Sequence, residues 1–81
     1  MVKKMSRLNN LVLSYKIVED YNKKLEKPLL PFVLKDYIKQ RTAVRDDTAK
    51  EYMTALENGI FIEGKLYKII LRDGGYSCLK K

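Results

Sequence analysis

The sequence predicts an α+β domain in which three helices are followed by a small antiparallel β-hairpin or three-stranded sheet. The first observation is a row of small and apolar side chains at the spacing of one helical face: Ala49, Tyr52, Met53 and Leu56. The second is a run of β-branched and aromatic residues at 60–71, interrupted by a Gly-Lys turn, which is typical of a hairpin. The 81 residues are enough for one domain, covering 1–81.

The first predicted helix covers residues 7–25 and follows a basic tail at residues 1–5. Lys3, Lys4 and Arg7 are expected either to be solvated or to lie along a phosphate backbone. Ser6 is a suitable N-cap, and the restricted geometry of the residue before Pro28 predicts that the helix ends there. One face of this helix carries the apolar side chains that a core requires: Leu8, Leu11, Val12, Tyr15, Val18 and Leu25.

A second apolar row, Leu13, Ile17 and Tyr21, falls on the opposite side of the same helix at about 100° per residue. Two apolar faces need two partners, because a soluble monomer normally avoids such an exposed patch. Either a second copy of the chain covers this row in a homodimer, or the C-terminal segment of the same chain covers it.

A very short strand at Leu29-Leu30 and a second helix at residues 31–40 come next. Pro31 suits the first helical position. The apolar positions of this helix are Phe32, Val33, Leu34, Tyr37 and Ile38. The side chains expected to face water are Lys35, Asp36 and Lys39.

The third predicted helix covers residues 45–58 and follows a turn at 40–43, with Val44 packed into the core. Asp46 and Asp47 stand in the first turn, where the helix dipole favours negative charge. Asn58-Gly59 tolerates the left-handed conformation that ends a helix.

Two hairpin tips are possible in the C-terminal part, one at residues 63–65 and the other at 72–75. Residues 76–79 resemble a further short strand. Cys78 lies among these strand residues, where a small buried side chain is a better interpretation than a reactive thiol.

The run Val44-Arg-Asp-Asp-Thr-Ala-Lys-Glu-Tyr-Met-Thr-Ala-Leu-Glu-Asn-Gly-Ile-Phe61 resembles the recognition helix and first wing strand of winged helix-turn-helix DNA-binding domains. Thr48, Ala49, Leu56 and Gly59 fit the spacing of that family. Arg45 stands where Ser or Thr is more usual, and the turn lacks the common Gly. The resemblance extends more loosely over nearly the whole chain and implies a small prokaryotic or archaeal-virus type regulator.

The resemblance also implies which residues contact DNA, in three groups. Those implied to face base edges are Arg45, Asp47, Lys50 and Thr54. Those implied to lie near the phosphate backbone are Lys39 and Arg41. Those implied to contact phosphate or the minor groove are Lys65 and Lys68, or Arg72 at the other tip. An aspartate on a reading helix repels phosphate but accepts a hydrogen bond from a cytosine amino group.

The charge balance favours a polyanionic partner. Seventeen Lys and Arg against ten Asp and Glu give a net charge of +7, which suits phosphate neutralisation. We therefore expect sequence-specific binding of double-stranded DNA, as in a transcriptional regulator. The alternative is a winged-helix module that binds protein instead, since an acidic start to the recognition helix is one way to lose DNA binding.

Other function classes are disfavoured by composition. The chain has no His and one Cys, so the usual zinc ligand sets and an internal disulfide are missing. No nucleophile with a base and no phosphate-binding glycine loop stands at a usable spacing, so we expect neither an enzyme nor a cofactor. No apolar run approaches the ~20 residues of a membrane span, and no apolar segment of a signal peptide follows the basic start. We expect a cytoplasmic protein.

Overall fold

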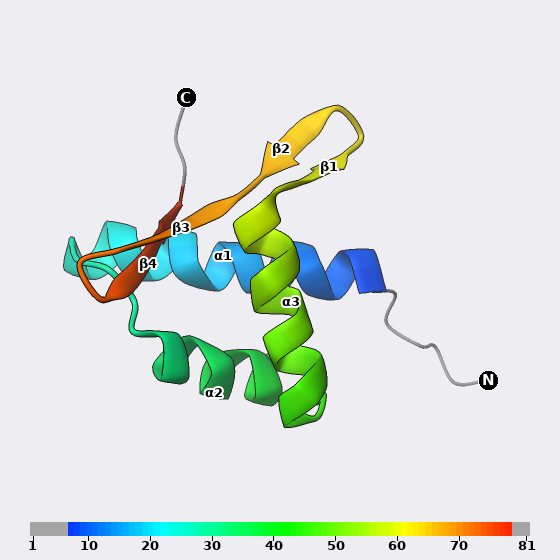
Figure 1. Cartoon of the computed structure of the whole chain (residues 1–81), viewed down its shortest axis with the longest axis horizontal. Coiled ribbons are helices and arrows are strands. Elements are labelled where there is room, and N and C mark those ends of the chain that lie inside the picture. Colours follow the sequence, from blue (N-terminus) through cyan, green and yellow to red (C-terminus); the bar gives the residue numbers. More distant parts are fainter. Residues whose placement is uncertain (1–6, 79–81) are drawn as a thin grey trace.

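Three helices come first in the chain and four short strands follow them, which confirms the α+β class and the expected order of elements (Figure 1). The computed structural model describes residues 7–78. The elements are α1 (Arg7–Leu25), α2 (Pro31–Thr42), α3 (Asp46–Asn58), β1 (Ile60–Ile62), β2 (Lys65–Tyr67), β3 (Ile69–Arg72) and β4 (Gly75–Cys78). The predicted tail at 1–5, the N-cap Ser6 and the last predicted strand residue, Leu79, lie outside the described residues.

The strands form two consecutive antiparallel hairpins, β1 with β2 and β3 with β4. Their turns are Glu63-Gly64 and Asp73-Gly74, and all four residues have positive φ, between 52° and 81°. This is the pattern of type I′ turns, whose twist matches that of the paired strands. Both predicted tips are therefore confirmed as turns, each joining its own pair of strands.

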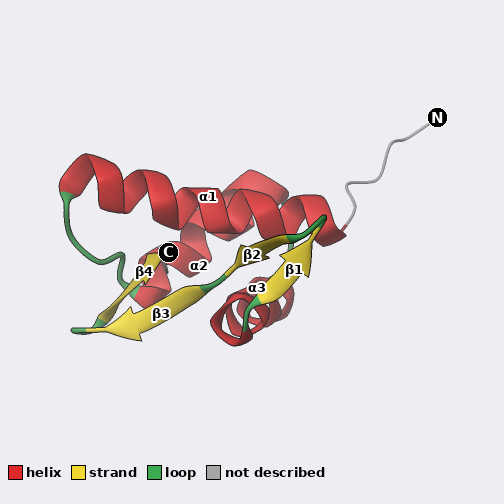
Figure 2. Cartoon of the chain, turned by 90° about the horizontal axis from the view of Figure 1, so that it is seen from above, coloured by secondary structure: helices red, strands yellow, loops and turns green. Residues whose placement is uncertain are grey.

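β2 and β3 are separated only by Lys68, so residues 65–72 run as one extended segment (Figure 2). β1 pairs with the first half of this segment and β4 with the second half. Leu29 adds a single antiparallel bridge to Tyr76, with backbone N–H···O distances of 2.7 and 3.0 Å. The short strand expected between the first two helices is thus confirmed at Leu29. Three helices with these hairpins are compatible with a winged-helix arrangement.

One core joins the three helices and the second hairpin. Its members with the least exposed surface are Leu11, Val18, Leu29, Leu34, Ile38, Ala49, Leu56 and Ile69. The predicted row of α3 is confirmed, because Ala49, Tyr52, Met53 and Leu56 are all buried. Complete burial of an aliphatic side chain of this size contributes about 1.5–3 kcal/mol.

The middle of α1 is buried and its two ends are not. Leu11 and Val18 lie in the core as predicted, but Leu8 and Leu25 are 52% and 49% exposed, so their predicted core placement is wrong. The reason is length, since the remaining elements cover only the central part of this 19-residue helix.

Side-chain contacts hold α1 against α3 and the first hairpin. The side-chain amide of Asn10 donates to the hydroxyl of Tyr52 in α3 at 3.0 Å. The rings of Tyr15 and Tyr67 meet edge to face, with centroids 5.0 Å apart, and tie α1 to the first hairpin. Such an aromatic pair contributes about 0.5–1.5 kcal/mol beyond its buried area.

α2 ends at Thr42, two residues later than predicted, and the buried Thr42 hydroxyl donates to the Ile38 carbonyl at 2.7 Å inside the last turn. Leu34 and Ile38 are buried as expected. Phe32 and Tyr37 are 65% and 39% exposed, so their predicted core placement is wrong. At about 100° per residue, Phe32 falls on the side opposite Leu34.

The last strand is held to α1 by one amide side chain. Asn22 donates through Nδ2 to the carbonyls of Lys27 and Tyr76 at 3.0 and 3.2 Å, and its Oδ1 accepts the N–H of Cys78 at 3.1 Å. Cys78 is half-buried and packs against the core, in keeping with the packing role expected for it. Asn22 thereby joins the end of α1, the following loop and β4.

The turn between α2 and α3 consists of residues 43–45, a little later than the predicted 40–43. Ala43 is left-handed (φ 55°, ψ 43°), and its N–H bonds to the Lys39 carbonyl at 2.9 Å. Val44 is half-buried and packs against the core, as predicted. Arg45 is extended (φ −78°, ψ 166°) and leads into α3.

Replacing Ala43 with Gly is expected to raise the free energy of unfolding by roughly 0.5–1 kcal/mol. The left-handed conformation costs an L-residue about 1–2 kcal/mol, and Gly removes this strain. Gly also makes the unfolded chain more flexible, which offsets part of the stabilisation. Ala43 is exposed, so no packing is lost. Urea denaturation followed by circular dichroism measures the change. Ala55→Gly inside α3 is the control and should lower stability by about 1 kcal/mol; a loss at both positions would contradict the prediction.

Candidate nucleic-acid interface

The start of α3 is held against α2 by one carboxylate. Asp46 forms ion pairs with Lys35 and Lys39 of α2 through Oδ1, at 3.2 and 3.4 Å, and with Lys50 one turn later through Oδ2, at 3.9 Å. The hydrogen bond from Lys35 is the main cause that holds the pKa of the Asp46 carboxyl below its usual value. The ionised Asp46 carboxylate therefore stabilises the folded state at pH values above the ordinary pKa of an aspartate. This stabilisation is lost as the pH falls through the lowered pKa.

This network separates the two adjacent aspartates. Asp46 is half-buried and engaged with three lysines, so its role is to position α3 on α2. Asp47 is exposed on the outer side of the helix. The expectation that Lys35 and Lys39 simply face water is wrong, because both are half-buried beside Asp46.

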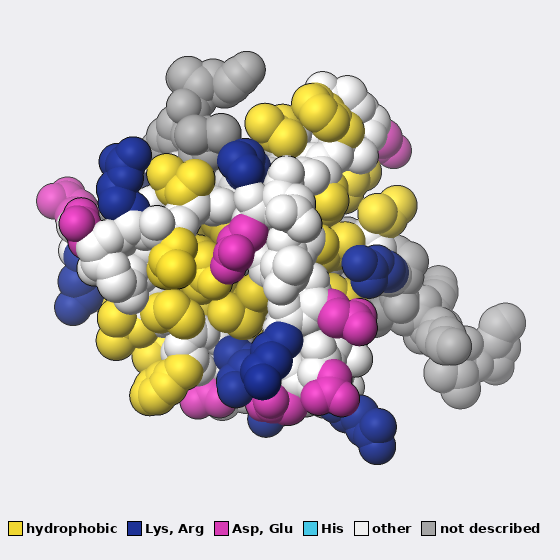
Figure 3. All heavy atoms as spheres, viewed as in Figure 1, with side chains coloured by type: hydrophobic (Ala, Val, Ile, Leu, Met, Phe, Trp, Pro, Cys, Tyr) yellow, Lys and Arg dark blue, Asp and Glu magenta, His cyan; other side chains and the backbone are white. Residues whose placement is uncertain are grey.

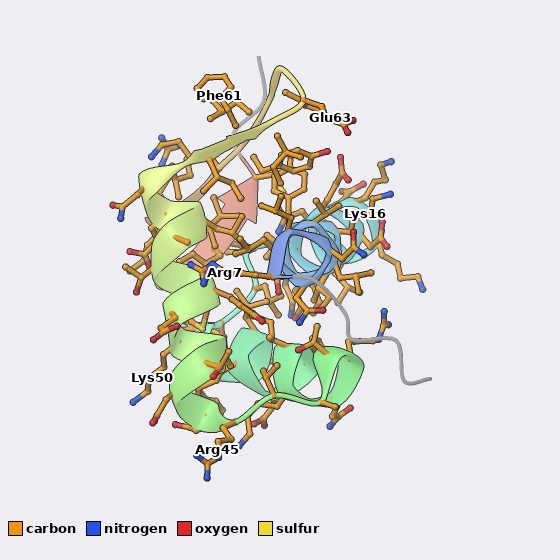
Figure 4. All side chains as sticks on the ribbon, turned by 90° about the vertical axis from the view of Figure 1, so that its right-hand side faces the viewer. Arg7, Lys16, Arg45, Lys50, Phe61 and Glu63 are labelled. Atoms are coloured by element: carbon orange, nitrogen blue, oxygen red, sulfur yellow. The ribbon has the colours of Figure 1, made fainter. Side chains whose placement is uncertain are left out.

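The outer face of α3 carries a shallow hollow of about 420 Å³. Its lining residues are Arg7, Asp47, Lys50, Glu51, Thr54, Ala55 and Asn58. All but Arg7 belong to α3, and Arg7 reaches the hollow from the start of α1 (Figure 4). Two cations and two carboxylates thus line a surface about the length of the helix.

The four residues predicted to face base edges lie together on this outer side. Arg45, Asp47, Lys50 and Thr54 are all exposed. Figure 4 shows Arg45 at the start of α3 and Lys50 just beyond it, both pointing away from the rest of the domain. The Thr54 hydroxyl also donates to the Lys50 carbonyl at 3.1 Å, so its oxygen can still accept a hydrogen bond.

The two residues predicted to lie near the backbone are not equivalent. Lys39 forms an ion pair with Asp46, as Lys35 does, and therefore stays close to the turn between α2 and α3. Arg41 instead lines a separate groove of about 330 Å³ between α1 and α2, together with Tyr37. The structure therefore separates Arg41 from the outer face of α3.

The predicted wing residues do not extend that face. Lys68 donates to the Glu57 carbonyl at the C-terminal end of α3, where a cation complements the helix dipole. Lys65 lies over the Tyr67 ring, 5.3 Å from its centroid. Arg72 is exposed at the second hairpin.

Both hairpin tips lie away from the start of α3 (Figure 1). Figure 4 places Phe61 and Glu63 of the first hairpin at the opposite end of α3 from Arg45. The second tip lies beside the α1–α2 connection, where Gly75 packs against Pro28 and Leu29. A straight duplex along the N-terminal half of α3 therefore has neither tip beside it in this arrangement.

The apolar row predicted for a homodimer is covered in large part by the same chain. Ile17 is 9% exposed and belongs to the core, and Tyr21 packs against that core. Leu13 is half-buried. The prediction of an open row on α1 is wrong for Ile17, and its intramolecular partner is α2, since Ile17 and Tyr21 share a groove with Tyr37.

The positive charge is concentrated near the chain ends. Residues 7–78 contain thirteen Lys and Arg and ten Asp and Glu, and the other four lysines are Lys3, Lys4, Lys80 and Lys81. α3 itself carries one Lys against four acidic residues. Arg45 and Arg7 are cations beside α3 that make none of the ion pairs described above.

Arg7 is the residue at this face that no sequence pattern connected with α3. With Lys3 and Lys4 it was expected to be either solvated or close to a phosphate backbone, and no spacing along the chain connects it with α3, which begins 39 residues later. Within residues 7–78, the structure has no cluster of three or more potential metal-ligating His, Cys, Asp or Glu side chains. No helix in that range is long and apolar enough to cross a membrane.

Compared with protein-family models, with curated proteins and with solved structures, the chain shows no significant match.

Proposed function

We propose that the chain binds double-stranded DNA with sequence specificity through α3 and the turn before it, as a transcriptional regulator of the winged helix-turn-helix type does. The supporting observation is the outer face of α3, which none of the other described elements crosses, with Arg45 and Lys50 pointing outward from it (Figure 4). A helix about 10–12 Å across fits the major groove of B-DNA, which is about 12 Å wide.

Some residues of this face are suited to contact the phosphate backbone, and others are suited to contact base edges. Arg45 and Lys50 supply cations for phosphate or guanine, and Lys39 adds a third near the turn. Asp47 and Thr54 are acceptors, and a carboxylate in the groove selects the amino group of cytosine. Asp46 is already matched by lysines, so it adds less repulsion toward phosphate than a free carboxylate would.

Titration of the purified protein with random-sequence duplex at several salt concentrations tests the proposal. Neutralisation of ~4–6 phosphates per protomer predicts a slope of about −4 to −5 for log K against log salt concentration. Selection from a random duplex pool should then enrich a common motif. A flat salt dependence, or no enrichment, would reject DNA recognition by this face.

A protein-binding module is the second candidate, favoured by a specific observation. α3 alone has a net charge of −3, which opposes a polyanion. Large apolar side chains are also exposed at Leu30, Phe32 and Leu71. Figure 3 shows hydrophobic surface between the second hairpin and α2, on the face that also presents α3. A flat salt dependence in the same titration would favour this candidate.

We also propose the predicted homodimer. Its contact would lie in the groove between α1 and α2, and not on the predicted row of α1, in which Ile17 is buried. Tyr21, Leu25 and Tyr37 leave apolar surface there, and Asp20, Lys24 and Arg41 supply charges of both signs. A two-fold contact can pair such opposite charges between copies. Sedimentation of the titrated samples at micromolar concentration measures the mass, and a monomer would exclude this dimer.

A further inference from the structure

Arg7 begins α1 but lies against α3. Its guanidinium carbon is 5.9 Å from the centroid of the Tyr52 ring, within the range of a cation–π contact. Tyr52 is itself fixed by its hydrogen bond with Asn10, at 3.0 Å. The position of Arg7 is therefore set by a buried aromatic ring that both α1 and α3 hold in place.

The contact with Tyr52 leaves Arg7 able to bind an anion. None of the ion pairs found among residues 7–78 involves Arg7. A guanidinium carries five N–H donors, so a contact of its central carbon with a ring leaves donors for a further partner. Arg7 is also exposed.

Arg7 lies beside α3 and not on it. It lines the outer hollow from the start of α1, over the ring of Tyr52 (Figure 4). A helix about 10–12 Å across fills the major groove, which is about 12 Å wide between its two phosphate backbones. A cation beside the helix would therefore lie close to one of these backbones.

We infer that Arg7 is a phosphate-contacting residue of the DNA surface on α3, and that it supplies the flanking contact which the hairpins do not. This inference rests on the proposed function. Lys68 is occupied by the end of α3, and the first hairpin tip lies at the far end of that helix.

The test compares Arg7→Ala with Lys16→Ala in binding to a random-sequence duplex across a range of salt concentrations. Lys16 is an exposed cation of the same helix, and Figure 4 shows it on the side of α1 away from α3. Arg7→Ala should reduce the slope of log K against log salt by about 0.9 and weaken binding roughly 5–10-fold near 0.1 M salt. Lys16→Ala should leave the slope unchanged.

A third variant, Arg7→Lys, distinguishes charge from packing. It keeps a cation at the position, so a phosphate contact predicts that it restores the wild-type slope, and thermal melting confirms that each variant is folded. A folded Arg7→Ala with the slope of Lys16→Ala would overturn the inference and leave the proposed function standing. A folded Arg7→Lys that keeps the reduced slope would also overturn it. A flat dependence for the wild type would instead reject DNA binding itself.

Discussion

Replacing Leu56 with Ala is expected to lower the free energy of unfolding by about 2–5 kcal/mol. The Leu56 side chain has no exposed surface and lies in the core where α3 packs on the other elements. Its truncation removes buried methyl groups and leaves a cavity that the surrounding helices fill only in part. A domain of this size has a total stability of only about 4–12 kcal/mol, so the variant should be partly unfolded at elevated temperature.

Leu71→Ala is the matched control, since it makes the same chemical change at a leucine that is 56% exposed. Surface substitutions of this kind usually change stability by less than about 0.5–1 kcal/mol. Thermal melting and urea denaturation of both variants measure the difference. At about 4–8 °C per kcal/mol, Leu56→Ala should lower the melting temperature by some tens of degrees. Equal effects at the two positions would show that the buried face of α3 is wrongly assigned.

The double variant Arg45→Ala/Lys50→Ala is expected to weaken duplex DNA binding roughly 10–100-fold near 0.1 M salt. Each cation that neutralises a phosphate contributes about 0.9 to the slope of log K against log salt, so the slope should fall by nearly two. The fold should survive, because Arg45 makes no side-chain cap bond and Asp46 keeps Lys35 and Lys39 after Lys50 is removed.

The control for this variant is Lys23→Ala/Lys27→Ala. Both lysines are exposed, at the far end of α1 and just after it, away from the start of α3 (Figure 1). The two double variants lose the same net charge, so long-range attraction of the duplex falls equally in both. Fluorescence anisotropy at matched salt should show the large loss only for Arg45→Ala/Lys50→Ala. Equal losses would mean that binding follows net charge and not the face of α3.

Much of the fold could be predicted because its signals are local. The buried row of α3 follows from helical spacing, and its end at Asn58 follows from Gly59, whose φ is 89°. The two hairpins follow from Glu-Gly and Asp-Gly pairs between β-forming residues. Each of these features depends on residues within one or two turns of each other, so neighbouring side chains are sufficient to specify them.

The outward-facing residues of α3 could be predicted from the sequence for the same reason, whereas their role as DNA contacts came from the resemblance to winged helix-turn-helix domains. Residues 45–54 form one continuous segment, and their outward direction is fixed once the buried row is known. The lysines outside that segment could not be assigned in this way. Lys68 becomes a helix-end donor and Lys39 an ion-pair partner only because α3 ends beside one and begins beside the other.

The sequence by itself determined the class, the order of the elements, and which side of each element is apolar. Only the tertiary structure decided what covers each side. α2 covers Ile17, whereas Phe32 is exposed to water. Arg7 lies over Tyr52, which is 45 positions later in the sequence. The physical reason is that periodicity describes directions around a single helix or strand. The crossing of one helix over another depends on how all buried surfaces pack together, and no local pattern encodes that geometry.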